Sequence, residues 1–138
     1  LENTNQIVAG ASMGGLMSMK TSILFPQFKN IISLSPAFWF GYPSVLNDIK
    51  NLSNESSTYL YTGKKEGHIF GDHVKNIFPN NWDLDFSNND DFYYSGVKNI
   101  KDSFDSNNKK VIFSFQDNGR HNETSWATAV LEILGKLI

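Results

Sequence analysis

The sequence predicts an α/β fold in which helices flank a parallel sheet, and three observations lead to this prediction. Four short apolar runs have the length and continuity of strands that are buried on both faces of a sheet. Segments with helical periodicity lie between or after these runs. Proline, glycine and polar clusters mark the boundaries. The expected order is strand, helix, strand, loop, strand, loop, helix, strand, helix.

The first helix and the first three strands are expected in the amino-terminal half. The apolar run "QIVAG" at 6–10 predicts the first strand, and 31–35 and 56–63 predict the second and third. Between the first two strands, apolar residues recur at helical spacing over Met13–Leu24, and Pro26 ends the helix. The residues that share this helical spacing are Leu16, Met19 or Lys20, and Ile23.

The second half begins with a polar segment. Residues 67–90 are rich in Asn, Asp and Gly, with a weak helical pattern near 73–78, and so long a loop is usually a functional lid or an insertion. A helix is expected over 90–104, where one face carries Tyr93, Val97, Ile100 and Phe104. The fourth strand is expected at 109–116 and a closing helix at 121–138, capped by Asn122. The apolar face of that last helix consists of Trp126, Val130, Ile133, Leu134 and Leu137.

The composition fits one domain over 1–138 and excludes several classes of partner. The chain has 138 residues, of which 40% are hydrophobic, enough for a core. A net charge of −2 gives no basic stripe that could bind a phosphate backbone, so we do not expect nucleic acid as a partner. No apolar run approaches the roughly 20 residues that span a bilayer, so we do not expect a membrane as a partner. The absence of cysteine excludes disulfides and leaves the compartment open, with a cytoplasmic location favoured.

The segment "GASMG" at 10–14 matches G-x-S-x-G, the nucleophile elbow, in which a serine sits on a strained turn between a strand and a helix. The expected strand ends at Gly10 and the expected helix begins at Met13, as the motif requires. Side chains at Gly10 and Gly14 are expected to collide with the neighbouring strand and helix. The pattern indicates Ser12 as a nucleophile, against the alternative of an ordinary turn residue.

A serine hydroxyl needs a base to accept its proton, and His121 is the best-situated histidine. It follows the fourth strand, at the edge of the sheet where α/β proteins gather their sites. The alternative is a capping or surface residue. His68 and His73 lie in the polar segment, where surface exposure is expected. Neither an H-E-x-x-H pattern nor a cysteine set accompanies them, so no metal and no cofactor are predicted.

The third member of such a site is a carboxylate that orients the imidazole and stabilises its charged form. In the order serine, acid, histidine it comes from the loop after the third strand, where Glu66 lies. Asp72 lies further along the same loop, and Asp117 is close to His121 in sequence. An ordinary solvated carboxylate is the alternative for each of the three.

Four motifs together resemble a known family. "GASMGGLMS", "SPAFWF", "YLYTGKKEG" and "GRHNETSW" stand in the same order and at similar spacing as in an esterase family of α/β-hydrolases, the group similar to enterobactin esterases and esterase D. The resemblance covers nearly the whole chain and implies the C-terminal half of an α/β-hydrolase fold. It also implies Ser12 as nucleophile, His121 as base, Glu66 as acid and the Met13 backbone N–H as an oxyanion donor.

The resemblance further implies that Phe38 and Trp39, with Phe40, border the substrate pocket, although packing in the core is the alternative for these rings. Members of the family carry a further N-terminal half, which holds the first strands and the loop that donates the second oxyanion N–H. That half is expected to be missing from this chain. A four-stranded sheet with a bare apolar edge is what half of a larger domain would show.

We therefore expect a cofactor-free serine hydrolase acting on small-molecule carboxylic esters. The isolated chain is expected to be weakly active or inactive, because losing one oxyanion donor typically costs about 10² to 10³ in rate. An inactive, hydrolase-like binding or scaffold domain is the alternative, and it would be favoured if Ser12 and His121 lay on opposite edges of the sheet. A nucleotide-binding loop is disfavoured because "GASMGG" lacks both G-x-G-x-x-G and the lysine of G-K-[ST]. Formation of a homo-oligomer is left open.

Overall fold

A single parallel sheet organises the computed structural model, which describes residues 6–78 and 84–137. Within these residues the strand order is β1-β2-β3-β4, with β1 Gln6–Ala11, β2 Phe28–Leu34, β3 Ser57–Gly63 and β4 Lys110–Gln116. The predicted α/β class, with a parallel sheet and flanking helices, is confirmed. The second strand begins at Phe28 rather than at 31 because Phe28 and Asn30 already pair with β1.

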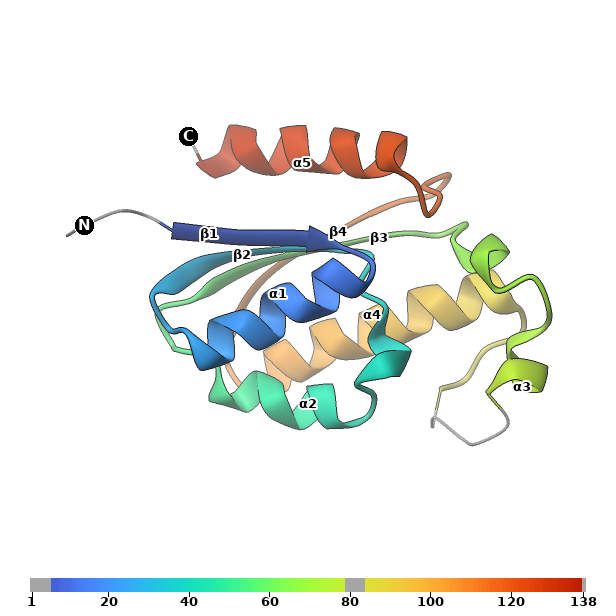
Figure 1. The fold of residues 1–138 in the computed structure, drawn as a ribbon, viewed down its shortest axis with the longest axis horizontal. Helices are drawn as coiled ribbons and strands as arrows, with labels where there is room; N and C mark the ends of the chain where they lie inside the picture. Colours follow the sequence, from blue (N-terminus) through green and yellow to red (C-terminus); the bar gives the residue numbers. More distant parts are fainter. Residues whose placement is uncertain (1–5, 79–83, 138) are drawn as a thin grey trace.

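Helices cover the two faces of the sheet unequally (Figure 1). The helices α1 (Met13–Leu24), α2 (Ser44–Asp48) and α4 (Asn89–Ser106) connect successive strands and lie on one face. The last helix, α5 (Glu123–Leu137), lies along the opposite face. Shorter helical turns complete the connections: η1 Phe38–Phe40, η2 Ile49–Asn51, η3 Gly67–Phe70 and α3 Val74–Ile77. All four strands therefore end at the same edge of the sheet, where the chain turns into α1, η1, η3 and α5.

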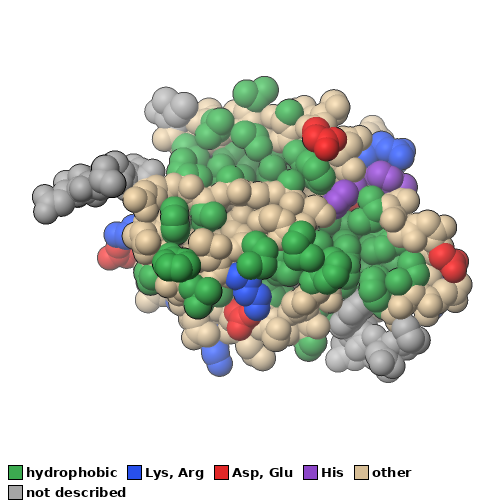
Figure 2. Space-filling view, in the orientation of Figure 1, with side chains coloured by type: hydrophobic (Ala, Val, Ile, Leu, Met, Phe, Trp, Pro, Cys, Tyr) green, Lys and Arg blue, Asp and Glu red, His purple; other side chains and the backbone are tan. Residues whose placement is uncertain are grey.

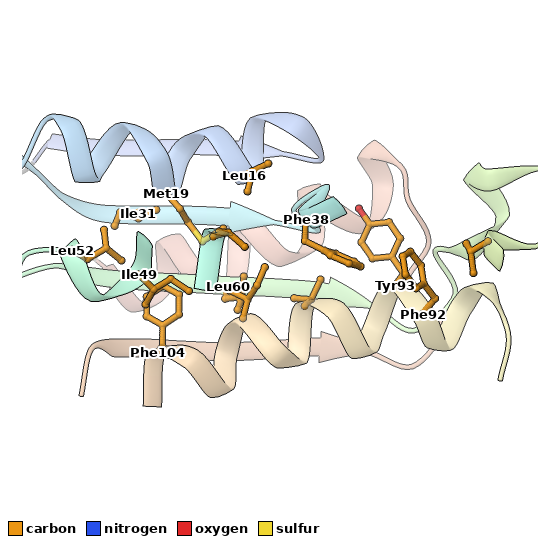
Figure 3. Packing of buried hydrophobic residues seen from close by; sticks show 14 residues of the cluster. Leu16, Met19, Ile31, Phe38, Ile49, Leu52, Leu60, Phe92, Tyr93 and Phe104 are labelled. Carbon is orange, nitrogen blue, oxygen red and sulfur yellow. The ribbon is translucent and has the colours of Figure 1, made fainter. Parts of the chain in front are cut away.

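The main core lies between the sheet and the three connecting helices (Figure 3). Each residue of the predicted apolar face of α4 is buried there: Tyr93, Val97, Ile100 and Phe104. Figure 3 shows Tyr93 beside Phe38 and Phe92. A second cluster joins the sheet to α5 through Ala129 and Ile133, with Trp126, Val130 and Leu137 packed around it. The continuous apolar pattern of the inner strands thus follows from burial on both faces.

The connections contain more helix than the sequence predicts. The loop after β2 holds α2, whose five residues are too few to show a helical period. The polar segment expected as a loop or lid over 67–90 contains η3, α3 and the beginning of α4. Residues 79–83 of that segment lie outside the described residues. A lid in this region stays a prediction.

Asn88 is the N-cap of α4, the longest of the described helices. Its side-chain Oδ1 accepts a hydrogen bond from the Asp91 backbone N–H at 2.8 Å. We expect Asn88→Ala to lower the free energy of unfolding by about 1 kcal/mol, because an N–H of the first turn loses its partner. Urea denaturation followed by circular dichroism measures this effect. Replacement by Asp, which can cap equally well, is the control that should keep the stability.

Candidate active site

Ser12 lies on the turn between β1 and α1 in a conformation that is rare for residues with a side chain. Its φ is 57°, in the left-handed region. Its carbonyl oxygen accepts hydrogen bonds from three backbone N–H groups, those of Gly15 at 3.0 Å, Leu16 at 3.2 Å and Ala37 at 2.9 Å. Its own N–H donates to the Leu34 carbonyl at 2.9 Å. These bonds tie the strained residue to α1, to β2 and to the segment after β2, as an elbow requires.

The glycines around Ser12 differ in how tightly they pack. A Cβ built at Gly10 would lie 2.3 Å from the Gly14 carbonyl oxygen, so the predicted collision at Gly10 is confirmed. The same prediction for Gly14 is wrong, because a Cβ there would have no described atom within 4 Å. The close contact falls instead at Gly15, whose Cβ would lie 2.8 Å from the Leu34 carbonyl oxygen. The reason is the direction of the helix face, since Gly15 faces β2 and Gly14 is exposed.

Bonds between two loops bring the segments after β3 and β4 together. The Lys64 backbone N–H donates to the Gln116 carbonyl and the Lys65 N–H to the Gly119 carbonyl, each at 3.0 Å. A Cβ at Gly63 would lie 2.2 Å from the Gly119 carbonyl oxygen. Because the two loops approach so closely, Glu66, which follows Lys65, lies near the segment that carries His121.

His121 reaches Ser12 from the loop between β4 and α5. Its Nε2 lies 2.9 Å from the Ser12 Oγ, although the two residues are far apart in the sequence. Its side chain is 11% exposed and lies between two aromatic rings. The Trp126 ring meets it edge-on with 4.9 Å between centroids, and the Tyr93 centroid lies at 5.4 Å. The imidazole is therefore held over the serine by its surroundings as well as by the hydrogen bond.

Glu66 is the carboxylate that the structure brings to His121. Its Oε1 lies 3.9 Å from the His121 Nδ1, which is within ion-pair distance and beyond a hydrogen bond. The carboxylate is fully buried and accepts hydrogen bonds from the Ser35 hydroxyl at 2.6 Å and the Thr62 hydroxyl at 3.1 Å. The His121 Nδ1 is buried and has no hydrogen-bond partner among the described residues. A small approach of the two side chains would complete the pair.

Burial shifts the titration of both groups, in opposite directions. Burial raises the pKa of Glu66 to about 7, against the lowering effect of its Ser35, Thr62 and Gly63 hydrogen bonds. Burial lowers the pKa of His121 to about 4, with a further contribution from His68. At pH 7 His121 is therefore neutral and able to accept a proton, while Glu66 is only partly ionised. Tyr93 keeps its proton, because burial raises its pKa well above the usual value.

The other candidate acids lie elsewhere. Asp117 is exposed and pairs with Lys64 at 3.3 Å. Asp72 is exposed and accepts a hydrogen bond from the His73 backbone N–H at 2.7 Å. His68 is exposed as expected, but its Nε2 also accepts a hydrogen bond from the His121 backbone N–H at 3.2 Å. Sequence order alone did not indicate this contact, which steadies the loop that carries His121.

Met13, expected as an oxyanion donor, and the three rings expected to border the substrate pocket differ in what they expose. Because Met13 is the first residue of α1, its N–H is one of the first-turn donors that have no partner within the helix. Met13 is 40% exposed. Phe38 is fully buried against Gly96 of α4 and belongs to the core. Trp39 is half-buried and Phe40 is 65% exposed. Of the three rings, only the last two have surface that a ligand could touch.

Comparison with known proteins finds no match for this chain, either among protein-family models or among curated proteins. Across the described residues there is no group of three or more His, Cys, Asp or Glu side chains that could hold a metal ion. None of the helices described is both long enough and apolar enough to cross a bilayer. The candidate site is therefore interpreted from its own geometry.

Sequence reasoning missed several residues that surround the site. The Ser35 hydroxyl donates to Glu66, the Trp126 indole N–H donates to the Ser35 hydroxyl, and the Tyr93 hydroxyl donates to the Ser35 carbonyl. Trp126 and Tyr93 were expected only as members of apolar helix faces, and the polar atoms of such rings leave no periodic signal. Ser35 carried one usable signal, a serine before proline at the end of an apolar strand.

Proposed function

We propose that this chain is a serine hydrolase of carboxylic esters, with Ser12 as nucleophile, His121 as base and Glu66 as acid. The distance of 2.9 Å between Ser12 Oγ and His121 Nε2, at a strained turn between strand and helix, carries this proposal. The pairing is the geometry that a serine nucleophile needs, because the hydroxyl can donate its proton directly to a neutral imidazole. The residues also follow the order serine, acid, histidine along the chain.

The reaction would proceed through an acyl-enzyme. Ser12 Oγ attacks the ester carbonyl as its proton moves to His121 Nε2, which gives a tetrahedral oxyanion and an imidazolium. The carbonyl re-forms as the bond to the alcohol oxygen breaks, and His121 returns the proton to that oxygen. Water then attacks the acyl-enzyme with His121 again as base, and the carboxylic acid leaves with Ser12 restored. Glu66 stabilises the imidazolium through Nδ1–H in both steps.

The Met13 backbone N–H would be one donor to the oxyanion. It belongs to the residue after the nucleophile and to the first turn of α1, where the helix dipole also favours negative charge. The exposure of Met13 leaves this end of α1 open to a substrate. Figure 2 shows histidine surface next to apolar surface, and we expect such a surface to suit an ester with hydrophobic groups.

We further propose that this sheet is the C-terminal half of an α/β-hydrolase fold. Two features support this. Along β1 no further strand pairs within the described residues, and Ile7 on that strand is 41% exposed. The outer face of α1 is apolar too, with exposed Met13, Met17 and Leu24. Figure 2 shows apolar surface on this side of the molecule, which a further part of the fold would cover.

An inactive scaffold is the second candidate, and one observation favours it. The buried Nδ1 of His121 lies 3.9 Å from the carboxylate and has no hydrogen bond among the described residues, so the imidazole is not held as tightly as in an assembled triad. The short distance between Ser12 and His121 argues the other way. The two candidates differ in whether Ser12 reacts.

An alkyl fluorophosphonate probe tests the proposal. We expect the chain to gain the mass of one probe group at Ser12 and Ser12→Ala to gain none, and we expect a slow rate if, as proposed, the second oxyanion donor belongs to the other half of the fold. His121→Ala should slow the labelling at least about 10²-fold, since the base is lost. Intact mass spectrometry with peptide mapping measures both. Ser44→Ala, which removes an exposed serine on α2, should label like the wild type. Equal labelling of the wild type and Ser12→Ala would contradict the proposal.

A further inference from the structure

Ser35 follows β2 and is joined by hydrogen bonds to β3, α4, α5 and Glu66. Its backbone N–H donates to the Tyr61 carbonyl of β3 at 2.7 Å. Its carbonyl accepts from the Tyr93 hydroxyl of α4 at 2.6 Å. Its Oγ donates to Glu66 Oε1 and accepts from the Trp126 Nε1–H of α5 at 3.0 Å. Every polar atom of this fully buried serine is thus engaged.

The direction of the Ser35 proton follows from the chemistry of its partners. The Trp126 indole N–H can only donate, so it occupies an acceptor site on Ser35 Oγ. An ionised carboxylate can only accept, so the single hydroxyl proton of Ser35 points to Glu66. A hydrogen bond to a charged group is shorter and stronger than one between neutral groups, which fits the 2.6 Å distance.

The same oxygen of Glu66 faces the base. Oε1, which accepts from Ser35, is the oxygen that lies 3.9 Å from His121 Nδ1. The Trp126 ring that bonds to Ser35 also packs edge-on against the imidazole. The carboxylate and the imidazole are therefore both fixed relative to one indole.

We propose that Ser35 and Trp126 are positioning residues, whose hydrogen-bond chain from Trp126 Nε1 through Ser35 Oγ to Glu66 Oε1 favours the ionised form of the carboxylate and keeps it facing His121. Its catalytic consequence rests on the proposed function, whereas the hydrogen-bond chain itself does not. The backbone agrees with such a role, because Ser35 is held at a φ of 44°, an unfavourable conformation that persists at functional sites.

The groups that act on Glu66 come from each neighbouring element. Asp90 of α4 opposes ionisation of Glu66, whereas Thr62 and the Gly63 backbone of β3 favour it, as Ser35 does. Tyr61 and Tyr93 stay protonated, since burial and the Glu66 charge raise the pKa of each. Among the hydrogen bonds that lower the pKa of Glu66, the bond from the Ser35 hydroxyl has the largest effect.

Nuclear magnetic resonance tests the chain without any need for activity. In protein labelled with ¹⁵N at tryptophan, the indole N–H signal of Trp126 is the one that Trp126→Phe removes. We expect this signal to shift with pH, with a midpoint near 7 that reports Glu66 through Ser35. Glu66→Gln should abolish the midpoint. A Trp126 signal that does not respond to pH in the wild type would overturn the proposal.

The catalytic consequence is tested by a double-mutant cycle on phosphonate labelling as a function of pH. Ser35→Ala should move the rising limb to higher pH by about one pH unit, roughly a tenfold loss of rate below the midpoint. Trp126→Phe, which keeps an aromatic ring beside His121, should move it in the same direction by less. In the double variant, loss of the indole N–H should add nothing, because it acts through Ser35. Additive effects, or a lower rate with an unmoved midpoint, would overturn the positioning role.

The two proposals can fail separately. Absence of labelling in the wild type would contradict the hydrolase, and the nuclear magnetic resonance titration would still decide the hydrogen-bond chain. Labelling at Ser12 with an unmoved pH limb in Trp126→Phe would leave the hydrolase standing and remove the positioning role. If Ser35→Ala does not fold, the Trp126→Phe pH profile and the indole titration decide the matter by themselves.

Discussion

Replacing Glu66 with glutamine is expected to reduce the rate of Ser12 labelling by up to about 10⁴-fold and to remove the rise in rate around pH 7. The physical reason is that a neutral amide cannot stabilise the imidazolium that forms when His121 takes the serine proton. Burial raises the pKa of Glu66 to about 7, so ionisation of this carboxyl governs the rising limb of the wild-type profile. His121, with its pKa lowered to about 4, is already neutral over that range.

The measurement is the labelling rate between about pH 5 and 9, which includes the pH at which Glu66 ionises. Asp117→Asn is the matched control, because it removes the charge of an exposed carboxylate that pairs only with Lys64 among the described residues. It should keep both the rate and the midpoint. A pH limb that survives in Glu66→Gln would assign the titration to another group and contradict the role of Glu66.

The same substitution is expected to stabilise the fold at alkaline pH. The pKa of Glu66 is about 7 in the folded chain and 4.5 as the reference, so the native state binds the proton more tightly. Its contribution to stability is fully present below pH 4.5 and is lost as the pH rises to 7, by about 3 kcal/mol. His121 acts in the opposite sense, since it loses stability as the pH falls from 6.5 to about 4. Because folded His121 is largely neutral at about pH 5 and above, this effect is expected to be similar in both proteins.

Urea denaturation at about pH 5 and about pH 8, on either side of the Glu66 pKa, measures the stability difference. Glu66→Gln and the wild type should have similar stability at the lower pH, and the variant should be the more stable at the higher pH. Greater stability together with lower activity is the pattern expected where a charge is kept buried for function. Equal stability at the higher pH would show that the buried carboxylate carries no desolvation cost.

The second large effect is expected from the substitutions Gly10→Ala and Gly15→Ala. A Cβ added at Gly10 would lie 2.3 Å from the Gly14 carbonyl oxygen of α1. A Cβ added at Gly15 would lie 2.8 Å from the Leu34 carbonyl oxygen of β2. Backbone cannot move aside as the end of a flexible side chain can, so each substitution is expected to cost about 3 kcal/mol or more. The expected measurement is a urea midpoint lowered by about 1 M or more, with an unchanged slope.

Gly14→Ala is the matched control for this prediction. It lies in the same turn, but its Cβ would meet no described atom within 4 Å. Because alanine favours a helix over glycine, its stability should be unchanged or higher by up to about 1 kcal/mol. A loss at Gly14 as large as that at Gly10 would show that the contacts of α1 with β1 and β2 do not set the requirement for glycine.

Much of the fold could be predicted because parallel strands buried on both faces appear as continuous apolar runs. The helices α1, α4 and α5 could be predicted from apolar residues at helical spacing, and Asn122 caps α5 as expected, with its Oδ1 accepting from the Ser125 N–H at 3.0 Å. The α2 helix did not, because it is shorter than two turns. The turn that carries Ser12 could be predicted because strand, motif and helix are contiguous in the sequence.

The surroundings of the site could not be predicted from the sequence to the same extent. Sequence order left Glu66, Asp72 and Asp117 as alternatives, because what separates them is burial, and burial depends on how the loops after β3 and β4 meet. Ser35 and Trp126 are joined by a side-chain bond between residues far apart in the chain. No periodicity or spacing reports such a bond. The distinction between Gly14 and Gly15 likewise needs the rotation of α1 against β2.

The three amide hydrogen bonds on the Ser12 carbonyl also have a dynamic consequence. The backbone amides of Gly15, Leu16 and Ala37 all donate to that one oxygen. The amide protons therefore cannot exchange with solvent unless the turn is disturbed. Two of these bonds are the first bonds of α1 and the third joins the turn to the segment after β2, so we expect the turn to open only when the beginning of α1 and this contact are both disrupted. Its amide protons should therefore exchange with solvent at the slow rate of the sheet, and Ser12 should keep its geometry for as long as the core stays folded.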